Sequence, residues 1–259
     1  MIKFEHTEVV GWEHVIRGMR NPMNSWEKSD SFVCDYDCSG CPQHDIDLWP
    51  ETECKGYFGE GDFVIGRNDH DLMMRLAKGG PVHAKYRRMI AVYVDITAPL
   101  YWWKEFDTYK VGTVANSCST MHKIHAKEFT LKDFSCEHLI GNYKHDCLIN
   151  EDEYDGPLNP LDILNDIINM LNKARDLYLE TKDKKYWWQM MQMLPSSYNQ
   201  KRTVMMNYEV LANIYKSRKD HKLDEWAEHR SLMSFCDWIK TLPYSELITR
   251  KMKGEQNEY

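Results

Sequence analysis

Four cysteines within 21 residues form the first group of side chains that could do chemistry. Cys34, Cys38 and Cys41 have the spacing C-x-x-x-C-x-x-C, Cys54 follows after twelve further residues, and His44 lies between them as a substitute ligand. Thiolate and imidazole are the ligands that zinc takes in structural sites. Two interpretations stay open: a structural metal site, with zinc as the plain choice, and reduced thiols without a metal, since a single C-x-x-C spacing is a weak signal.

The first three cysteines also match the spacing of the iron–sulfur motif in radical S-adenosylmethionine enzymes. In that motif three thiolates leave one iron open for the cosubstrate. The glycine-rich strand and helix repeats of a TIM-like barrel do not follow these cysteines. The iron–sulfur interpretation therefore rests on three residues alone.

A second group of polar side chains lies near the C-terminal end. Asn207, Asn213 and Arg218 are separated by six and five residues. A helix over Thr203 to Tyr215 would place the two asparagines within about 120° of each other, with Arg218 just beyond. Amide and guanidinium groups in this arrangement could bind a planar heterocycle. Ordinary surface polarity is the alternative.

The elements that must position these groups are predicted from hydrophobic spacing and from capping signals. Strands are expected over Glu8–Val10 and Met89–Thr97, where β-branched residues are frequent. Residues 30–66 lack a sustained period and are expected to form an inserted Cys-rich loop, and residues 251–259 are expected to be a disordered tail. The predicted helices are Trp12–Met19, Asn68–Lys78, Leu100–Phe106, Phe129–His138, Leu161 to about Leu179, Lys184–Leu194, Thr203–Tyr215 and Leu223–Ile239.

Composition limits the classes of function. The 259 residues are 42% apolar, which is enough to bury a substantial core, and we expect a single domain. A net charge of -7 argues against nonspecific binding to nucleic acid or anionic lipid. The absence of a long apolar run and of a signal-peptide pattern predicts a cytoplasmic protein without a membrane partner.

Five landmarks resemble the flavin-dependent thymidylate synthases over most of the chain outside the cysteine segment. His83 stands sixteen residues before Pro99, at the place of the histidine in the family's H-x-x-P-F-E-H segment. The run YVDITAPLYW is similar to the family's strand, proline break and helix start. Asn116 and Ser119 match the N-x-x-S part of the signature R-H-R-x-x-S-x-N-x-x-S-x-R.

The remaining two landmarks lie in the C-terminal third of the chain. Leu194-Pro195 matches the L-P that precedes the family's last helix pair. The last landmark matches in spacing the polar residues with which the family holds the flavin and the pyrimidine: Asn207, Asn213, Arg218, His221 and Trp226.

The resemblance implies an α+β fold with a central antiparallel-type sheet flanked by long helices. It implies FAD as cofactor, dUMP as the family's substrate, and a homotetramer with sites shared among subunits. The implied flavin contacts are His83, Asn207, Asn213 and His221. The implied substrate contacts are Asn116, Ser119, Glu105 and Arg218, with Ser119 and Arg218 serving catalysis.

The departures from the family pattern concern positive charge. Tyr109-Lys110-Val111 stands in place of Arg-His-Arg, and Met121, Met191 and Glu209 stand where the family has arginines. A phosphate monoester carries roughly -1.5 to -2 charges at neutral pH and is commonly bound by bidentate arginines. The sequence therefore predicts an altered, less anionic substrate.

Three functional hypotheses follow. The first is a flavin-dependent enzyme that transfers a one-carbon unit to a pyrimidine nucleotide or nucleoside. The second is a noncatalytic descendant that binds a nucleotide, or a protein partner through Trp102, Trp103, Trp187 and Trp188. The third is a metal-dependent enzyme that uses Cys34, Cys38 and Cys41.

Overall fold

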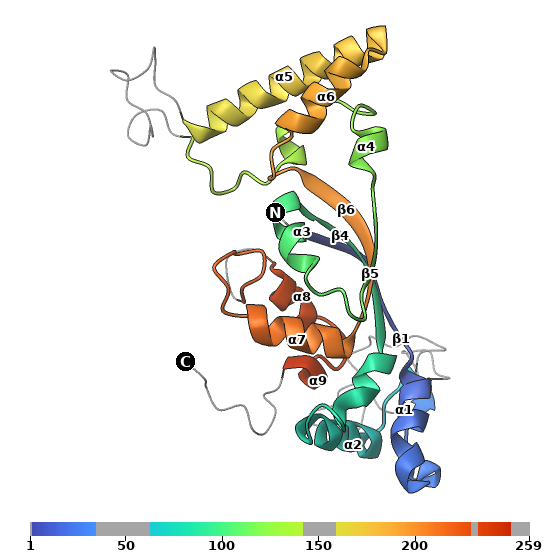
Figure 1. Cartoon of the computed structure of the whole chain (residues 1–259). Helices are drawn as coiled ribbons and strands as arrows, with labels where there is room; N and C mark the ends of the chain where they lie inside the picture. Colours follow the sequence, from blue (N-terminus) through green and yellow to red (C-terminus); the bar gives the residue numbers. More distant parts are fainter. Residues whose placement is uncertain (1, 35–62, 142–158, 229–232, 250–259) are drawn as a thin grey trace.

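The computed structural model describes residues 2–34, 63–141, 159–228 and 233–249. Its centre is a four-stranded sheet in the order β1-β4-β6-β5, in which each neighbouring pair is antiparallel (Figure 1). The longest pairing joins β4 to β6, from Ala91 opposite Asn207 to Pro99 opposite Asn199. The strands are β1 (Lys3–Val10), β4 (Ala91–Pro99), β5 (Val114–Ser117) and β6 (Asn199–Asn207).

Along strand β4, buried apolar residues alternate with more exposed residues. Val92, Val94, Ile96 and Ala98 are each at most 1% exposed, and the residues between them lie on the opposite face. β-Branched residues with period two are typical of a strand that buries one face. The proline at its end then opens α3 (Leu100–Phe106), where Trp102, Trp103 and Phe106 are buried.

Helices pack beside the sheet and at both of its ends (Figure 1). One group packs beside the strands and shares their core: α7 (Tyr208–Arg218), α8 (Phe235–Lys240) and α9 (Glu246–Thr249). At one end of the sheet, α5 (Pro160–Thr181) and α6 (Lys184–Met193) form an arm with a second core, which includes Leu171 and Met190. The side chain of Asn159 caps α5 by accepting the Asp162 N–H at 3.0 Å.

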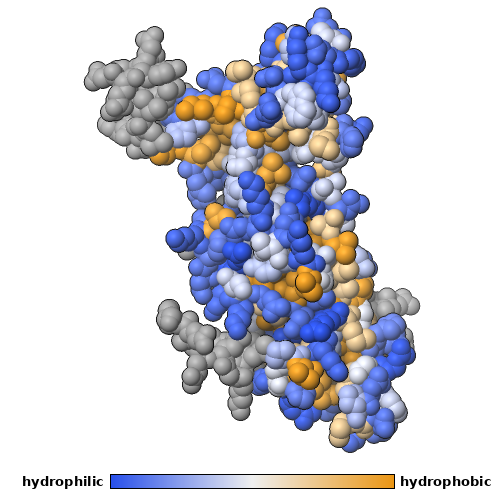
Figure 2. Space-filling model, viewed as in Figure 1, coloured by the Kyte–Doolittle hydropathy of each residue, from blue (hydrophilic) through white to orange (hydrophobic). Residues whose placement is uncertain are grey.

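The arm also carries apolar side chains that the chain does not bury. Ile163 and Met170, seven residues apart on α5, are exposed, whereas Ile167 between them is half-buried against the core of the arm. Figure 2 shows apolar residues gathered over this helix. None of the described helices is both long and apolar enough to cross a membrane.

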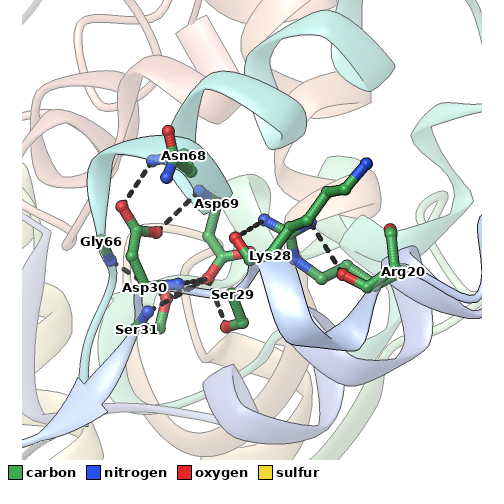
Figure 3. A network of polar contacts seen from close by, with 9 residues as sticks. Arg20, Lys28, Ser29, Asp30, Ser31, Gly66, Asn68 and Asp69 are labelled. Atoms are coloured by element: carbon green, nitrogen blue, oxygen red, sulfur yellow. Dashed lines mark hydrogen bonds and ion pairs between the residues drawn. The ribbon is translucent and has the colours of Figure 1, made fainter.

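At the opposite end of the sheet, α1 (Trp12–Arg20) and α2 (Arg67–Lys78) are joined by a polar network (Figure 3). Arg20 Nε donates to Asp69 Oδ1 at 2.6 Å, and the hydroxyls of Ser29 and Ser31 each donate to Asp69 Oδ2 at 2.6 Å. Asp69 is fully buried and Arg20 nearly so. Next to this network, β2 (Phe32–Val33) pairs with β3 (Phe63–Val64) in an antiparallel arrangement.

Three short 3₁₀ segments lie next to α1 and α2. They are η1 (Asn21–Met23), η2 (Trp26–Lys28) and η4 (Ala84–Met89). Most predicted helices are confirmed within one or two residues, and α3 is confirmed at both bounds. The mixed α and β class is also confirmed.

Three predicted helices are wrong in whole or in part. The helix predicted over Thr203–Tyr215 begins only at Tyr208, as α7, and its first five residues end β6, because pairing with β4 and β5 on both sides outweighs the helix propensity of the methionines there. Only the 3₁₀ turn η5 (Leu131–Asp133) forms within Phe129–His138, where Phe134 instead makes a β-bridge to Tyr198.

The third wrong prediction is the long helix over Leu223–Ile239. The described residues of this stretch form turns up to Glu228, and α8 begins only at Phe235. Ser234 and Asp237 form a capping box that fixes this start, since each side chain accepts from the other residue's backbone N–H. The S-x-x-D spacing of Ser234 and Asp237 is the sequence signal from which the start of α8 could have been predicted.

Candidate functional site

Arg218, the last residue of α7, lies at the centre of a polar cluster. Its Nε donates to the Tyr109 hydroxyl at 2.8 Å, and its Nη1 donates to Glu105 Oε2 at 2.6 Å. Glu105 belongs to the last turn of α3, and Tyr109 to the loop that follows it. The end of α7 and the end of α3 therefore supply the two halves of this cluster.

Aromatic rings fix the position of the guanidinium. Its central carbon lies 5.2 Å from the ring centroid of Trp226 and 5.6 Å from that of Tyr109. Trp226 is fully buried and stacks on Trp102, with 4.5 Å between the ring centroids. Cation–π attraction to this buried ring favours the observed position of the Arg218 guanidinium.

His221 is the third polar member of the cluster. The Leu223 N–H donates to His221 Nδ1 at 3.1 Å. The other ring nitrogen, Nε2, lies 2.7 Å from Arg218 Nη1 and 3.5 Å from Glu105 Oε2. The Glu105 carboxylate therefore faces both the guanidinium and the imidazole.

The loop that carries His221 is tied to the helices on both sides. The Tyr101 hydroxyl of α3 donates to the carboxylate of Glu225, and burial followed by this hydrogen bond raises the pKa of Tyr101. The Tyr215 hydroxyl donates to Glu228 at 2.7 Å. These contacts hold the turn after α7 against α3, which places His221 beside Glu105.

The charges of the cluster nearly cancel. Arg218 is paired with Glu105, and their side chains are 18% and 34% exposed. A site of this kind offers hydrogen-bond donors and acceptors to a ligand without a net positive charge. It suits the edge of a neutral heterocycle better than a phosphate group.

The two predicted asparagines do not share a helix face. Asn207 ends β6 and caps α7, where its Oδ1 accepts the Val210 N–H at 3.0 Å, whereas Asn213 is exposed in the middle of α7. Gly112 packs against Asn207: it has a φ of +78°, and a Cβ on it would lie 3.0 Å from Asn207 Nδ2. Asn207 and Arg218 are thus at opposite ends of α7, about 17 Å apart along its axis.

Asn116 lies in the edge strand β5, and Ser119 follows this strand. Asn116 is exposed and stands opposite Thr203, and Ser119 caps the short helix α4 (Thr120–Lys123) by accepting the His122 N–H at 3.1 Å. Seven residues of extended chain separate Gly112 from Ser119, which corresponds to about 20 Å. Ser119 therefore lies far from Asn207 within one chain.

The other predicted site residues lie elsewhere. His83 is exposed at the start of η4, and within the described part of the chain it makes no hydrogen bond to the other predicted site residues. Cys34 is buried, whereas Cys38, Cys41 and Cys54 lie outside the described residues. No group of three metal-ligating side chains occurs among the residues that are described.

Sequence reasoning missed Tyr109 as a partner of Arg218. A signal existed, because Tyr109 stands where the family resemblance expects the first signature arginine. It also missed a group of lysines around a cavity beside Ser119, formed by residues that are distant in the sequence. Lysines alone carry no such signal, since a lysine is more often a solvated surface residue.

Comparison by sequence finds no matching protein family and no matching curated protein. Comparison of structures finds flavin-dependent thymidylate synthases. One is thymidylate synthase X from Helicobacter pylori with FAD and dUMP, which is 14% identical, with 96% of this chain and 95% of that chain covered and a TM-score of 0.54. Another, the flavin-dependent thymidylate synthase of the same organism complexed with FAD and dUMP, gives 14% identity, 95% and 97% coverage and a TM-score of 0.55. The chain therefore shares the fold of these enzymes.

Proposed function

We propose that the chain binds a flavin and a pyrimidine nucleotide or nucleoside, and that it transfers a one-carbon unit to the pyrimidine. The observation that carries this proposal is the Arg218 cluster. Glu105 is 113 positions from Arg218 in the sequence, yet these two residues and His221, all expected from the family resemblance, lie within 3.5 Å of one another. The similar solved structures hold FAD and dUMP, which supports the choice of ligands.

The cluster fits a pyrimidine ring. Arg218 can donate to a ring carbonyl and stabilise negative charge that develops on the ring, and Glu105 can accept from a ring N–H. We assign substrate contact to Arg218, Glu105 and Ser119, with Arg218 and Ser119 as the catalytic candidates. Asn116, on the exposed edge strand, completes the proposed substrate set.

The fit to FAD rests on the donor set of the described residues. Asn207 uses its amide oxygen as a helix cap, which leaves Nδ2 as a donor toward a flavin ring. Asn213, His83 and His221 complete the proposed flavin contacts. A bound flavin would supply the carrier for methylene and hydride transfer, and the protein would position the reactants.

A binding protein without catalysis is the second candidate, and one observation favours it. Glu105 neutralises Arg218, so a charge that should stabilise a developing anion is already engaged. Of the four tryptophans proposed to bind a protein partner, Trp102 and Trp103 cannot take part, because both are at most 1% exposed, whereas Trp188 is exposed.

The test begins with the absorption spectrum of the purified protein and extraction of its cofactor. We expect flavin absorption, or a rise in melting temperature when FAD is added. A colourless protein whose melting temperature does not change with FAD would contradict the flavin assignment.

The substrate assignment is tested with Arg218→Gln, compared with Arg17→Gln on the exposed face of α1. We expect the first variant to weaken the binding of deoxyuridine about 10- to 100-fold, because it removes a charged hydrogen-bond donor, and the second to leave it unchanged. Equal affinities in both variants would remove the assignment.

A further inference from the structure

A cavity of about 810 Å³ opens where α4, η5 and the first residues of β6 meet. Its size is that of sites for small molecules and cofactors. Ser119 and Thr120 contribute hydroxyls to its wall, and the rings of Phe134 and Tyr198 contribute apolar surface. The cavity is therefore large enough for a ligand that has both a ring and a polar group.

Positive charge is concentrated around this cavity. Five lysines from different parts of the chain line it, against the two carboxylates of Asp133 and Glu137. The excess of cations stands out in a chain whose net charge is -7. The lysines are Lys3, Lys123, Lys127, Lys132 and Lys201.

Two of these lysines already have partners, and two are available to a ligand. Lys127 pairs with Asp133, and Lys201 lies 3.2 Å from Glu5 Oε2 and 3.1 Å from Asp95 Oδ2. Within the described part of the chain, Lys123 and Lys132 form no ion pair, and both are exposed. Their ammonium groups can move to meet an anion without first breaking an existing contact.

Ser119 supplies a directed donor beside these cations. Its oxygen accepts the His122 N–H at 3.1 Å, so its own hydroxyl hydrogen remains available for a ligand in the cavity. Lysine binds phosphate as a point charge, and a neighbouring hydroxyl adds direction. The chemistry that best matches this wall is a phosphate or diphosphate group attached to a ring-bearing ligand.

We propose that this cavity binds the phosphate groups of a nucleotide, with Lys123 and Lys132 as the principal cations and Ser119 as a hydrogen-bond donor. The inference rests on the proposed function for the identification of the ligand as a nucleotide. It replaces the sequence-based expectation of a less anionic substrate, because lysines at other positions provide charge that the missing arginines would have given. The neutral Arg218 cluster then remains for the ring.

The test measures binding by calorimetry to the full chain and to a Lys123→Gln/Lys132→Gln variant. Two matched pairs of ligands separate the sources of phosphate: dUMP with deoxyuridine, and FMN with riboflavin. We expect the wild type to bind the phosphorylated member of one pair at least about 10-fold more tightly, and the variant to lose this ratio while its affinity for the unphosphorylated member is unchanged. Lys28→Gln/Lys78→Gln, two exposed lysines at the other end of the molecule, is the charge-matched control.

The pair whose ratio collapses identifies the ligand that carries the phosphate. Ratios that survive in Lys123→Gln/Lys132→Gln, or that fall equally in the control, overturn the inference. Inorganic pyrophosphate separates this result from the proposed function. If the wild type binds pyrophosphate through these lysines but binds neither pyrimidine nor flavin, the anion site stands and the proposed function falls. If the wild type does not bind pyrophosphate, the site falls.

Discussion

Some residues of this chain have both a structural role and a proposed role in ligand binding. The two roles must be measured separately before a residue is assigned to catalysis. Asn207 is the clearest case. Its amide oxygen caps α7, while its Nδ2 lies beside Gly112. A substitution there changes the start of a helix as well as a proposed flavin contact.

The prediction at this scale compares Asn207→Ala with Asn213→Ala. Removing the cap should lower the free energy of unfolding by about 1 kcal/mol, whereas Asn213 is exposed and its replacement should change stability little. Urea denaturation measures both. If the two residues contact a flavin, both variants should also bind FAD more weakly, and an unchanged FAD affinity in Asn213→Ala would remove that residue from the site.

Helices α1 and α2 are held together by a buried charge, so their pairing depends on pH. Burial by itself raises the pKa of Asp69, but hydrogen bonds from Ser29 and Ser31 and the ion pair with Arg20 outweigh it and lower this pKa. A carboxyl group whose pKa is depressed in the folded state contributes stability at pH values above its unfolded pKa. That contribution is lost as the pH falls through the folded pKa.

The prediction for these helices concerns Asp69→Asn. At neutral pH the variant should be less stable than the wild type by about 3 kcal/mol, because Arg20 is left buried without its counter-charge. The difference should shrink as the pH is lowered from about 5 toward 3, since the wild type then loses the same charge. Asp71→Asn, at an exposed position of α2, is the control. A constant difference between Asp69→Asn and the wild type across this range would contradict the argument.

For the whole molecule, the distances between the proposed contacts are decisive. Asn207 packs against Gly112, whereas Ser119 lies beyond the other end of β5, about 20 Å away. The side chains of Asn207 and Ser119 are therefore too far apart to contact one mononucleotide within a single chain. They can serve one site only where surfaces of different copies meet, as the homotetramer implied by the family resemblance would allow.

The prediction at this scale is that the protein in solution has a mass that is a multiple of 30.8 kDa. Light scattering coupled to size-exclusion chromatography measures it. We expect oligomers, with a tetramer as the assembly implied by the resemblance. A monomeric protein that binds both dUMP and FAD would show instead that each ligand occupies a site within one chain.

The sequence by itself determined the elements whose signals are local. Alternation of β-branched residues fixed β4, Pro99 fixed the start of α3, and Asn159 fixed the start of α5. It also led to Glu105, Arg218 and His221, because their order and spacing resemble those of a family, although the spacing alone did not show that the three side chains meet.

Only the tertiary structure decided features that depend on contacts between distant residues. Strand β6 forms because two neighbouring strands satisfy its backbone hydrogen bonds, a condition that its own residues do not encode. Likewise, the neutral pairing of Arg218 with Glu105 and the gathering of five lysines around one cavity arise from folding, which brings together side chains up to 198 positions apart. Local spacing specifies where a helix or strand begins, whereas the charge around a ligand is set by residues that meet only in the folded chain.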